Sequence, residues 1–360
     1  MPLPYRPGDP VPKFRLPALS GNPQFSFDTV AGRYILMLFF GSAAQPATAE
    51  ALALVEREAA VFDDVKACFF GVTADPTDEA EGRIAQVIPG RRFFLDYQGG
   101  VSKGYGAVDE EGRYRPYWLL LDIDMRVLGA AELDRGAALI DLLRRLPPPG
   151  EIDRFAPVIV IPNVFERDVC RNLVELYDAN GGEDSGFMRE VDGKTVGLID
   201  HSHKKRSDWV IDDDALRADL RRRIERRLVP EIRKAFQFPV SRMERYIVAR
   251  YDGDTGGYFR PHRDNTTSGT AHRRFACTIN LNAEEYDGGD LRFPEYGKRT
   301  YRAPTGGAVV FSCSLLHEAC PVTRGARYAF LPFLYDEAAA EVREANNPNL
   351  GEGLGEYKKG

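Results

Sequence analysis

The sequence predicts two domains, an α/β sandwich followed by an antiparallel double sheet of jelly-roll type with flanking helices. Its 360 residues, 43% of them hydrophobic, are enough for two separate cores. Strand-like and helix-like runs alternate in the first half, whereas short strands separated by glycine pairs follow residue 245. Between these regions, the Pro-Pro-Pro-Gly run at 147–150 cannot continue a helix. We therefore expect a domain at 1–146, a proline-rich linker at 147–156, a second domain at 157–340 and a tail at 341–360.

The elements of the first domain follow from continuous apolar runs and one helix-like run. A short apolar run bounded by turn residues is typical of a buried strand. The predicted strands cover residues 34–40, 67–73 and 117–122, and the predicted helix covers 47–60. Strands that alternate with a helix indicate a sheet with helices packed on it.

The elements of the second domain change in character along the chain. An amphipathic helix is predicted at 166–179, and Gly181 ends it. An arginine-rich helix is predicted at about 215–236. The predicted strands that follow are 245–251, 275–281, 290–293, 308–311 and 328–335. Short strands at this spacing are typical of a jelly roll.

Charge and cysteine usage narrow the range of partners and compartments. The formal net charge of -6 argues against a surface built for nucleic acids or anionic membranes, so we expect a small-molecule or peptide substrate. The five cysteines are scattered, without a C-x-x-C pair, which fits a reducing cytoplasm. No stretch approaches the roughly 18 apolar residues of a membrane span, and no export signal is visible.

Three side chains form the pattern that carries chemistry. His262 and Asp264 are two residues apart, so on an extended chain both point to the same side. His317 comes 53 residues after Asp264, just past a predicted strand that a double sheet can return to the first pair. Two imidazoles and one carboxylate on one face of an octahedron are the iron ligands of Fe(II) oxygenases. We predict that these residues bind one iron ion.

Arg327 lies ten residues beyond His317, at the start of an apolar strand. A guanidinium there needs an anionic partner, and its planar shape matches a carboxylate. The distal carboxylate of 2-oxoglutarate would supply that partner. An isolated H-x-D pair is a weak signal, but the pair, the distant histidine and this arginine together are a strong one.

Further segments surround the predicted ligands: Tyr-Asp-Gly at 251–253, Asn-Leu-Asn at 280–282, Gly-Gly-Asp-Leu-Arg-Phe-Pro at 288–294, Gly-Ala-Val-Val-Phe-Ser at 307–312 and His-Glu-Ala-Cys-Pro-Val at 317–322. With these segments, the chain from about residue 157 to 336 resembles the prolyl 4-hydroxylase-like branch of the Fe(II)/2-oxoglutarate oxygenases. The resemblance implies that Tyr251 helps to hold 2-oxoglutarate and that Arg327 pairs with its far carboxylate. Asn280 stands where several relatives carry an aromatic residue facing the cosubstrate, which implies a different pocket shape.

The resemblance also implies an activity. The cofactors would be Fe(II), 2-oxoglutarate and O2, with ascorbate as a reductant, and the reaction would hydroxylate a C–H bond with release of succinate and CO2. The substrate stays open between a prolyl residue and a free metabolite. One alternative is a non-catalytic binding or scaffold protein that retains a metal, and another is a thiol peroxidase.

The first domain contains an ordered series of short segments: Pro-Gly-Asp-Pro-Val-Pro-Lys-Phe-Arg-Leu at 7–16, Leu-Phe-Phe-Gly at 38–41, Phe-Leu-Asp at 94–96, Gly-Tyr-Gly at 104–106 and Tyr-Trp-Leu at 117–119 after Arg115. In this order they resemble peroxiredoxins of the thioredoxin-like fold. Thr48 occupies the position of the peroxidatic cysteine, and a threonine hydroxyl cannot replace a thiolate. Cys68 is expected to be a buried, inert thiol. The domain is predicted to be a docking or dimerisation module, or to shape substrate access, rather than to be a peroxidase.

Other polar clusters have simpler interpretations. His201 and His203 are expected in a solvated or substrate-facing loop, and His272 at the surface or a hinge. The arginine run at 221–227 follows three aspartates and predicts a salt-bridged, solvent-exposed helix face.

Overall fold

The computed structural model describes residues 3–19 and 21–359 and divides the chain into two compact units. The first unit comprises Met1–Phe155 together with Pro294–Arg299. The second comprises Ala156–Phe293 and Thr300–Gly360. Each is a separate fold with its own buried core.

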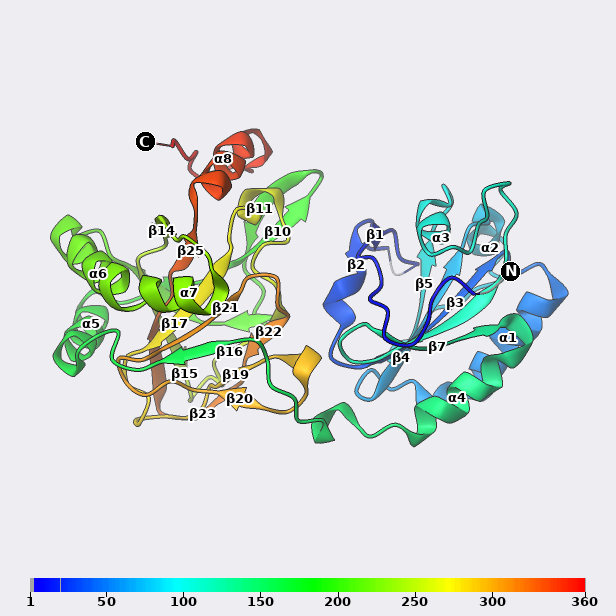
Figure 1. The fold of residues 1–360 in the computed structure, drawn as a ribbon, viewed down its shortest axis with the longest axis horizontal. Helices are drawn as coiled ribbons and strands as arrows, with labels where there is room; N and C mark the ends of the chain where they lie inside the picture. The colour runs from blue at the N-terminus through cyan, green and yellow to red at the C-terminus, as the bar shows by residue number, and fades with distance from the viewer. Residues whose placement is uncertain (1–2, 20, 360) are drawn as a thin grey trace. The chain divides into compact units, whose positions relative to one another are not determined.

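The first unit contains a five-stranded mixed sheet with the order β5-β4-β3-β6-β7 (Figure 1). The strands are β3 (Tyr34–Gly41), β4 (Ala67–Thr73), β5 (Arg91–Leu95), β6 (Tyr117–Leu121) and β7 (Val127–Glu132). The first three are parallel, and β6 and β7 continue the sheet in antiparallel pairing. The helices are α1 (Pro46–Arg57), α2 (Pro76–Ala80), α3 (Gly100–Gly104) and α4 (Gly136–Arg145), and β1 (Arg15–Leu16) pairs with β2 (Phe25–Ser26).

Helices α1 and α4 cover one face of this sheet. Their apolar residues, including Val55 and Leu143, share a cluster with alternate residues of β3 such as Leu36 and Leu38. The predicted strands match the observed ones within a residue, and the α/β sandwich is confirmed. Helix α1 ends at Arg57, three residues before the predicted end, and a short 3-10 turn follows at Ala59–Val61.

The second unit is built on two antiparallel sheets. The smaller has the order β12-β16-β22-β19-β20, formed by β12 (Lys204–Lys205), β16 (Tyr258–His262), β22 (His317–Ala319), β19 (Leu291–Arg292) and β20 (Thr300–Tyr301). The larger contains β14 (Arg242–Glu244), β25 (Phe333–Tyr335), β17 (Phe275–Asn280), β24 (Ala326–Phe330), β15 (Ile247–Asp252), β13 (Ser207–Val210) and β9 (Glu183–Asp184), with β21 (Ala308–Ser312) and β8 (Ile159–Ile161) attached through β17. Two more pairs are β10 (Phe187–Val191) with β11 (Lys194–Leu198), and β18 (Asp287–Gly288) with β23 (Val322–Arg324).

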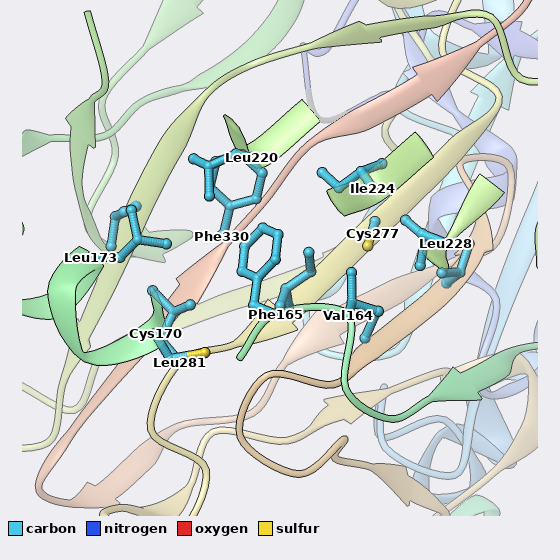
Figure 2. Close-up of a cluster of buried hydrophobic side chains, with 14 of the residues drawn as sticks. Val164, Phe165, Cys170, Leu173, Leu220, Ile224, Leu228, Cys277, Leu281 and Phe330 are labelled. Carbon is cyan, nitrogen blue, oxygen red and sulfur yellow. The ribbon is translucent and has the colours of Figure 1, made fainter. Parts of the chain in front are cut away.

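Helices pack on the outer face of the larger sheet. They are α5 (Arg167–Asn180), α6 (Asp214–Arg227) and α7 (Val229–Phe236), and α8 (Glu337–Ala345) follows the last strand. Figure 2 shows the resulting core, which contains Leu173 of α5, Ile224 of α6, Cys277 of β17 and Phe330 of β24. This packing leaves the opposite face of the sheet to line the interior between the two sheets, because side chains alternate along a strand.

Three sequence predictions for this unit are wrong in detail. The helix predicted at 215–236 is two helices, because Pro230 lacks the N–H that an unbroken helix would need and starts α7 instead. The strand predicted at 328–335 is likewise divided at Pro332 into β24 and β25. The residues assigned to a tail from 341 include half of α8, whose N-cap Asp336 accepts the N–H of Ala339.

In the part of the chain that the structure describes, no helix is both long and apolar enough to cross a membrane.

Candidate metal centre

Strand pairing in the smaller sheet brings the three predicted ligands together. His262 ends β16 and lies directly opposite His317, the first residue of β22. Asp264 follows two residues after His262, and its carboxylate lies 3.5 Å from Nε2 of His262 and 3.3 Å from Nε2 of His317. One ligand atom of each residue lies within 4.8 Å of the others. That spacing suits a single metal ion held by all three side chains.

Backbone carbonyls orient both imidazole rings. Nδ1 of His262 lies 2.8 Å from the carbonyl oxygen of Arg260, and Nδ1 of His317 lies 3.0 Å from that of Leu315. A proton on each Nδ1 would leave the Nε2 lone pair directed at the shared centre, as in metal-binding histidines. The Phe259 ring stacks on His262 at 3.5 Å and helps to fix its plane.

Burial sets the protonation of the cluster. Burial, and then the neighbouring His317, lowers the pKa of His262 to about 4. Burial acts to raise the pKa of Asp264, but His317 and the hydrogen bond with His262 outweigh it and hold the pKa below its usual range. At neutral pH the His262 ring is therefore neutral and Asp264 is ionised, which are the states that bind a metal.

Arg327 is the second residue of β24 and is only 2% exposed. Its Nε and Nη1 have no hydrogen-bond partner among the described residues. Its guanidinium lies 4.9 Å from the ring of Tyr251, the residue paired with it across β15 and β24. A buried guanidinium with free donors is costly unless an anion occupies the space beside it.

Tyr286 belongs to the same interior, although no sequence pattern predicts this, because it lies in the loop after β17. Its hydroxyl is buried and has no hydrogen-bond partner among residues 3–19 and 21–359. Its ring shares an apolar cluster with Tyr251, and both Tyr286 and Arg327 approach the backbone at Gly289, where a Cβ atom would lie 3.3 Å and 3.1 Å from them. Gly289, at φ +67°, keeps this space open.

Asn280 is also buried and lies on the interior face of β17, since its neighbour Ile279 is part of the outer core. Its Nδ2 donates to the carbonyl oxygen of Ala303 at 2.7 Å, and its Oδ1 is without a partner in the described chain. Tyr251 differs, because its hydroxyl accepts from Nη1 of Arg206 at 3.3 Å.

The expectation that His272 lies at the surface or a hinge is wrong. Its side chain is 1% exposed, and Nε2 lies 3.0 Å from the carboxylate of Glu244 on β14. The flanking arginines suggested solvent, but Arg273 pairs with the same carboxylate at 2.6 Å. The buried carboxylate of Glu244, on a distant strand, therefore balances the charge of a segment whose flanking arginines suggested solvent exposure.

His201 lies in an exposed turn, as expected, and contacts Asp184. His203 lies in the same turn but is partly buried, and its ring packs 4.6 Å from that of Phe187. The arginine run at 221–227 is salt-bridged, with Asp219, Glu225 and Glu166 as its partners, while the preceding Asp212 and Asp214 pair with Arg217 of the same helix.

In the first unit, the residue predicted to stand at the position of a peroxidatic cysteine is buried. Thr48 in α1 is 1% exposed, and its hydroxyl is buried without a partner among the described residues. Cys68 lies inside β4, and burial raises the pKa of its thiol to about 12. Neither side chain offers a nucleophile at neutral pH.

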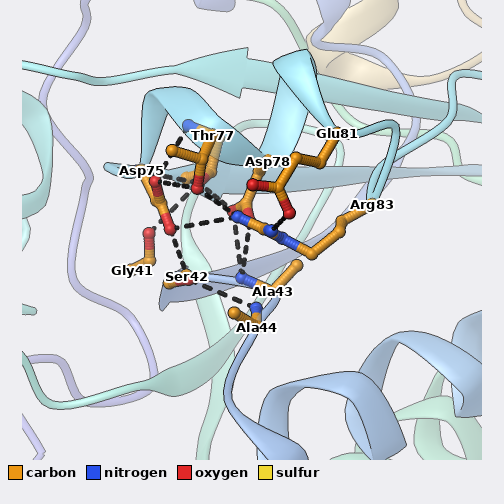
Figure 3. Close-up of polar contacts among 10 residues, drawn as sticks. Gly41, Ser42, Ala43, Ala44, Asp75, Thr77, Asp78, Glu81 and Arg83 are labelled. Carbon is orange, nitrogen blue, oxygen red and sulfur yellow. Dashed lines mark hydrogen bonds and ion pairs between the residues drawn. The ribbon is translucent and has the colours of Figure 1, made fainter.

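A buried carboxylate fixes the loop before α1 (Figure 3). Asp78 is fully buried and accepts hydrogen bonds from the Ala43 N–H at 2.9 Å, the Thr73 hydroxyl at 2.6 Å and Nε of Arg83 at 2.8 Å. Ser42 donates to Asp75 at 2.6 Å beside it. These contacts hold the loop in one conformation.

Comparison with known proteins places the metal centre in a family. A family model described as the 2OG-Fe(II) oxygenase superfamily matches residues 246–335, the span that contains the three candidate ligands and Arg327. A PKHD-type hydroxylase from Cupriavidus metallidurans is 40% identical over 89 residues, covering 22% of this chain and 38% of that protein. Another, from Shewanella baltica, is 30% identical over 188 residues, covering 49% of this chain and 77% of the relative. The chain belongs to the PKHD-type hydroxylases of this superfamily.

Solved structures are similar to each part of the chain at low sequence identity. A prolyl hydroxylase from Trichoplax adhaerens, in complex with a hypoxia inducible factor peptide, shows 17% identity and a TM-score of 0.38 over 51% of this chain and 85% of its own. A Pseudomonas putida prolyl-4-hydroxylase shows 18% identity and a TM-score of 0.36 over 50% and 93%. Peroxidoxin BcpB from Mycobacterium tuberculosis shows 22% identity and a TM-score of 0.34 over 39% and 98%.

Proposed function

We propose that the second unit is an Fe(II)- and 2-oxoglutarate-dependent dioxygenase that hydroxylates a C–H bond. The observation that carries this proposal is the convergence of His262, Asp264 and His317, with three ligand atoms within 4.8 Å of one another. Two imidazoles and one carboxylate leave adjacent coordination positions free for a cosubstrate and O2. Bound iron would activate O2, which is the oxidant: one oxygen atom would convert C–H to C–OH, and the other would enter succinate as 2-oxoglutarate loses CO2.

The interior residues fit a dicarboxylate cosubstrate. Arg327 has buried donors without partners in the part of the chain that the structure describes, and the Tyr286 hydroxyl, which is likewise without a partner there, lies on the same side of the interior. We assign the distal carboxylate to Arg327, with Tyr251 packed beside the guanidinium. Asn280 would contribute its free Oδ1 or the space that an aromatic residue would otherwise fill.

The chain contributes to the reaction by orienting the metal ligands and by excluding water from one side of the metal centre. The two rings are held by backbone carbonyls before a metal arrives, so little rearrangement is needed on binding. Phe259 and Phe311 pack against the two imidazoles and keep water away from that side. This arrangement follows from the two sheets facing each other, which we assign to the double-stranded β-helix form of jelly roll.

The substrate class stays open between a prolyl residue in a peptide and a free metabolite, and ascorbate is proposed as the reductant that keeps iron ferrous. For the first unit we propose docking or dimerisation rather than peroxide reduction, because Cys68 is buried with a pKa of about 12. A cytoplasmic location is part of the same proposal, since all five cysteines are free thiols.

Anaerobic loading with Fe(II) and 2-oxoglutarate, followed by O2, tests the activity. Succinate formation is the expected result, and iron should bind at about one ion per chain in the wild type. His262→Ala and Asp264→Ala should each lose iron and turnover, because two ligands cannot hold the metal under dilution. His201→Ala is the matched control, since that side chain is exposed and, among the described residues, pairs with Asp184 rather than with the metal ligands.

Two outcomes would contradict the proposal. Unchanged iron content in both ligand variants would show that the metal binds elsewhere. Tight iron binding without succinate from a broad set of candidate substrates would favour the alternative of a metal-containing binding or scaffold protein.

A further inference from the structure

The side chain of a buried lysine, Lys204, is separated from the candidate metal ligand His262 by the ring of Phe259. Lys204 in β12 pairs with Phe259 of β16 and is 3% exposed. Its Nζ lies 4.9 Å from the centre of the Phe259 ring, and that ring stacks on His262 at 3.5 Å. The lysine therefore points into the interior between the sheets, on the side of His262.

The hydrogen-bond partners of the Lys204 ammonium group are uncharged, so none of them balances its positive charge. Nζ donates to the hydroxyl of Ser185 at 2.7 Å and to the carbonyl oxygen of Gly186 at 2.6 Å. An ammonium group has three protons, so one donor remains. Within the described chain, no carboxylate forms an ion pair with Lys204.

Two neighbouring guanidinium groups add further positive charge near Lys204. Arg206 is 8% exposed, donates to Asp208 at 2.6 Å, and has a buried Nε without a partner in the described chain. Arg245 also reaches Asp208, at 3.6 Å. One carboxylate thus serves two guanidinium groups, and Lys204 is left uncompensated. Burial, and then repulsion by Arg206, lowers the pKa of Lys204 well below its usual range.

The metal centre cannot supply the missing negative charge. With Fe(II) and a 2-oxoglutarate dianion in place, the charges of the ion, the cosubstrate, Asp264 and Arg327 balance one another. An unpaired charge is costly in the buried space around Lys204 and Arg206, so the neutral form of Lys204 is favoured while no anion is present, and a bound anion would favour the ammonium form. An anion that enters with the substrate would remove that cost.

We propose that Lys204, supported by Arg206, binds a carboxylate group of the primary substrate close to the C–H bond that is oxidised. The inference rests on the proposed function and deepens it, because it assigns the substrate to the carboxylic acids. The third ammonium proton and the free Nε of Arg206 are the donors for this group.

The chain offers a matched control in the next residue. Lys205 lies in the same strand, and among the described residues its Nζ donates to one group, the carbonyl oxygen of Thr255, at 3.4 Å. Neighbouring residues of a strand point to opposite faces. Lys205→Gln therefore removes the same charge from the same strand outside the interior.

Acetate and its neutral analogue acetamide are suitable probes for the full-length protein. The protein is loaded with redox-silent Mn(II) and saturated with the inert cosubstrate analogue N-oxalylglycine, and binding is followed by the paramagnetic relaxation of ¹³C-labelled probe. Acetate should show saturable relaxation enhancement and acetamide should not. Lys204→Gln should weaken acetate binding about tenfold or more, the range for loss of a charge-assisted hydrogen bond, and Lys205→Gln should leave it unchanged.

Three results would overturn the inference: no saturable acetate binding to the wild type, equal binding of acetamide, or full acetate binding in Lys204→Gln, which would place the anion on the metal. Mn(II) and N-oxalylglycine occupancy is measured in the same samples. Failure of those two to bind would count against the proposed function, whereas their binding without an acetate effect would count against the lysine site alone.

Discussion

Arg263, the residue between the two predicted ligands of β16, shows how single side chains fix the metal centre. It is 7% exposed and donates to the carbonyl oxygen of Ser314, in the loop that leads to His317. The residue that points away from the metal therefore ties one ligand segment to the other. This contact could not be read from the H-x-D spacing, which predicts only the directions of His262 and Asp264.

Arg327→Ala tests the cosubstrate site at this scale. Affinity for 2-oxoglutarate should fall about 10- to 100-fold, the range for losing a charge-assisted contact with a carboxylate, while iron content stays unchanged. Isothermal titration of 2-oxoglutarate into the Mn(II)-loaded protein measures the affinity, and metal analysis of separately Fe(II)-loaded samples measures the iron content. Arg324→Ala is the matched control, because that arginine is exposed and pairs with Asp287. Equal affinities in the two variants would remove Arg327 from the site.

Thiol reactivity tests the burial of the cysteines. Cys68, Cys170, Cys277 and Cys313 are buried, and Cys320 is partly buried with a pKa raised to about 11. In the native protein at pH 8, a thiol reagent should modify at most Cys320 quickly, and all five after denaturation. Rapid loss of a second thiol, identified by mass spectrometry as Cys68, would reopen the thiol peroxidase alternative.

At the scale of elements, the sequence predicted types and positions well and boundaries less well. Continuous apolar runs gave β3 and β4 because a fully buried strand has a distinct pattern. The division of one predicted helix into α6 and α7, and of one strand into β24 and β25, followed from single prolines that the apolar pattern hides. Tyr286, Lys204 and Glu244 could not be predicted, because their importance depends on partners far away in the chain.

Glu244 connects β14 to the C-terminal helix α8 through Arg343 at 2.9 Å and to Arg273 at 2.6 Å. Burial acts to raise the pKa of Glu244, but Arg273, His272 and Arg343 outweigh it and hold the pKa well below its usual 4.5. A carboxyl with a lowered folded-state pKa stabilises the fold above its unfolded pKa, and this contribution is lost as the pH falls through the folded value.

Glu244→Gln should accordingly reduce the free energy of unfolding at pH 7 by about 3 kcal/mol, because it leaves buried cations unpaired. The difference from wild type should shrink as the pH is lowered below about 4.5, where the unfolded carboxyl takes up a proton. Urea denaturation at a series of pH values measures this. Glu337→Gln, at an exposed acid that pairs with Arg242, should change stability little at any pH. A pH-independent difference would refute the electrostatic cause.

At the scale of the whole molecule, the two units are not two consecutive stretches of chain. The segment Pro294–Arg299 belongs to the first unit although it lies within the sequence of the second. The N–H of Arg154 donates to the carbonyl oxygen of Tyr296 at 3.0 Å, and the N–H of Lys298 donates to that of Ile152 at 2.8 Å. The proline run predicted a boundary near residue 150, but no local pattern could predict this second passage of the chain.

Fragments of the second unit should reflect these bonds. A fragment of residues 149–360 retains the backbone partners of Tyr296 and Lys298, whereas a fragment of 156–360 loses them. We expect the shorter fragment to show a lower urea midpoint and faster proteolysis near residue 296, because its backbone groups there lose their protein partners. Identical midpoints and cleavage patterns would show that the segment is stable by itself.

Because the first unit includes the distant segment Pro294–Arg299, the two units cannot be exchanged between proteins as two consecutive pieces of sequence. Gly297, at φ +95°, passes so close to Ile152 that a Cβ atom there would lie 2.0 Å from its carbonyl oxygen, and any larger residue would push the two apart. An evolutionary fusion or exchange of the first half would therefore have to preserve a short stretch of the oxygenase gene. Recombination at a single crossover between the two halves would separate the segment around Ile152 and Arg154 from the segment Pro294–Arg299, which are joined by backbone hydrogen bonds.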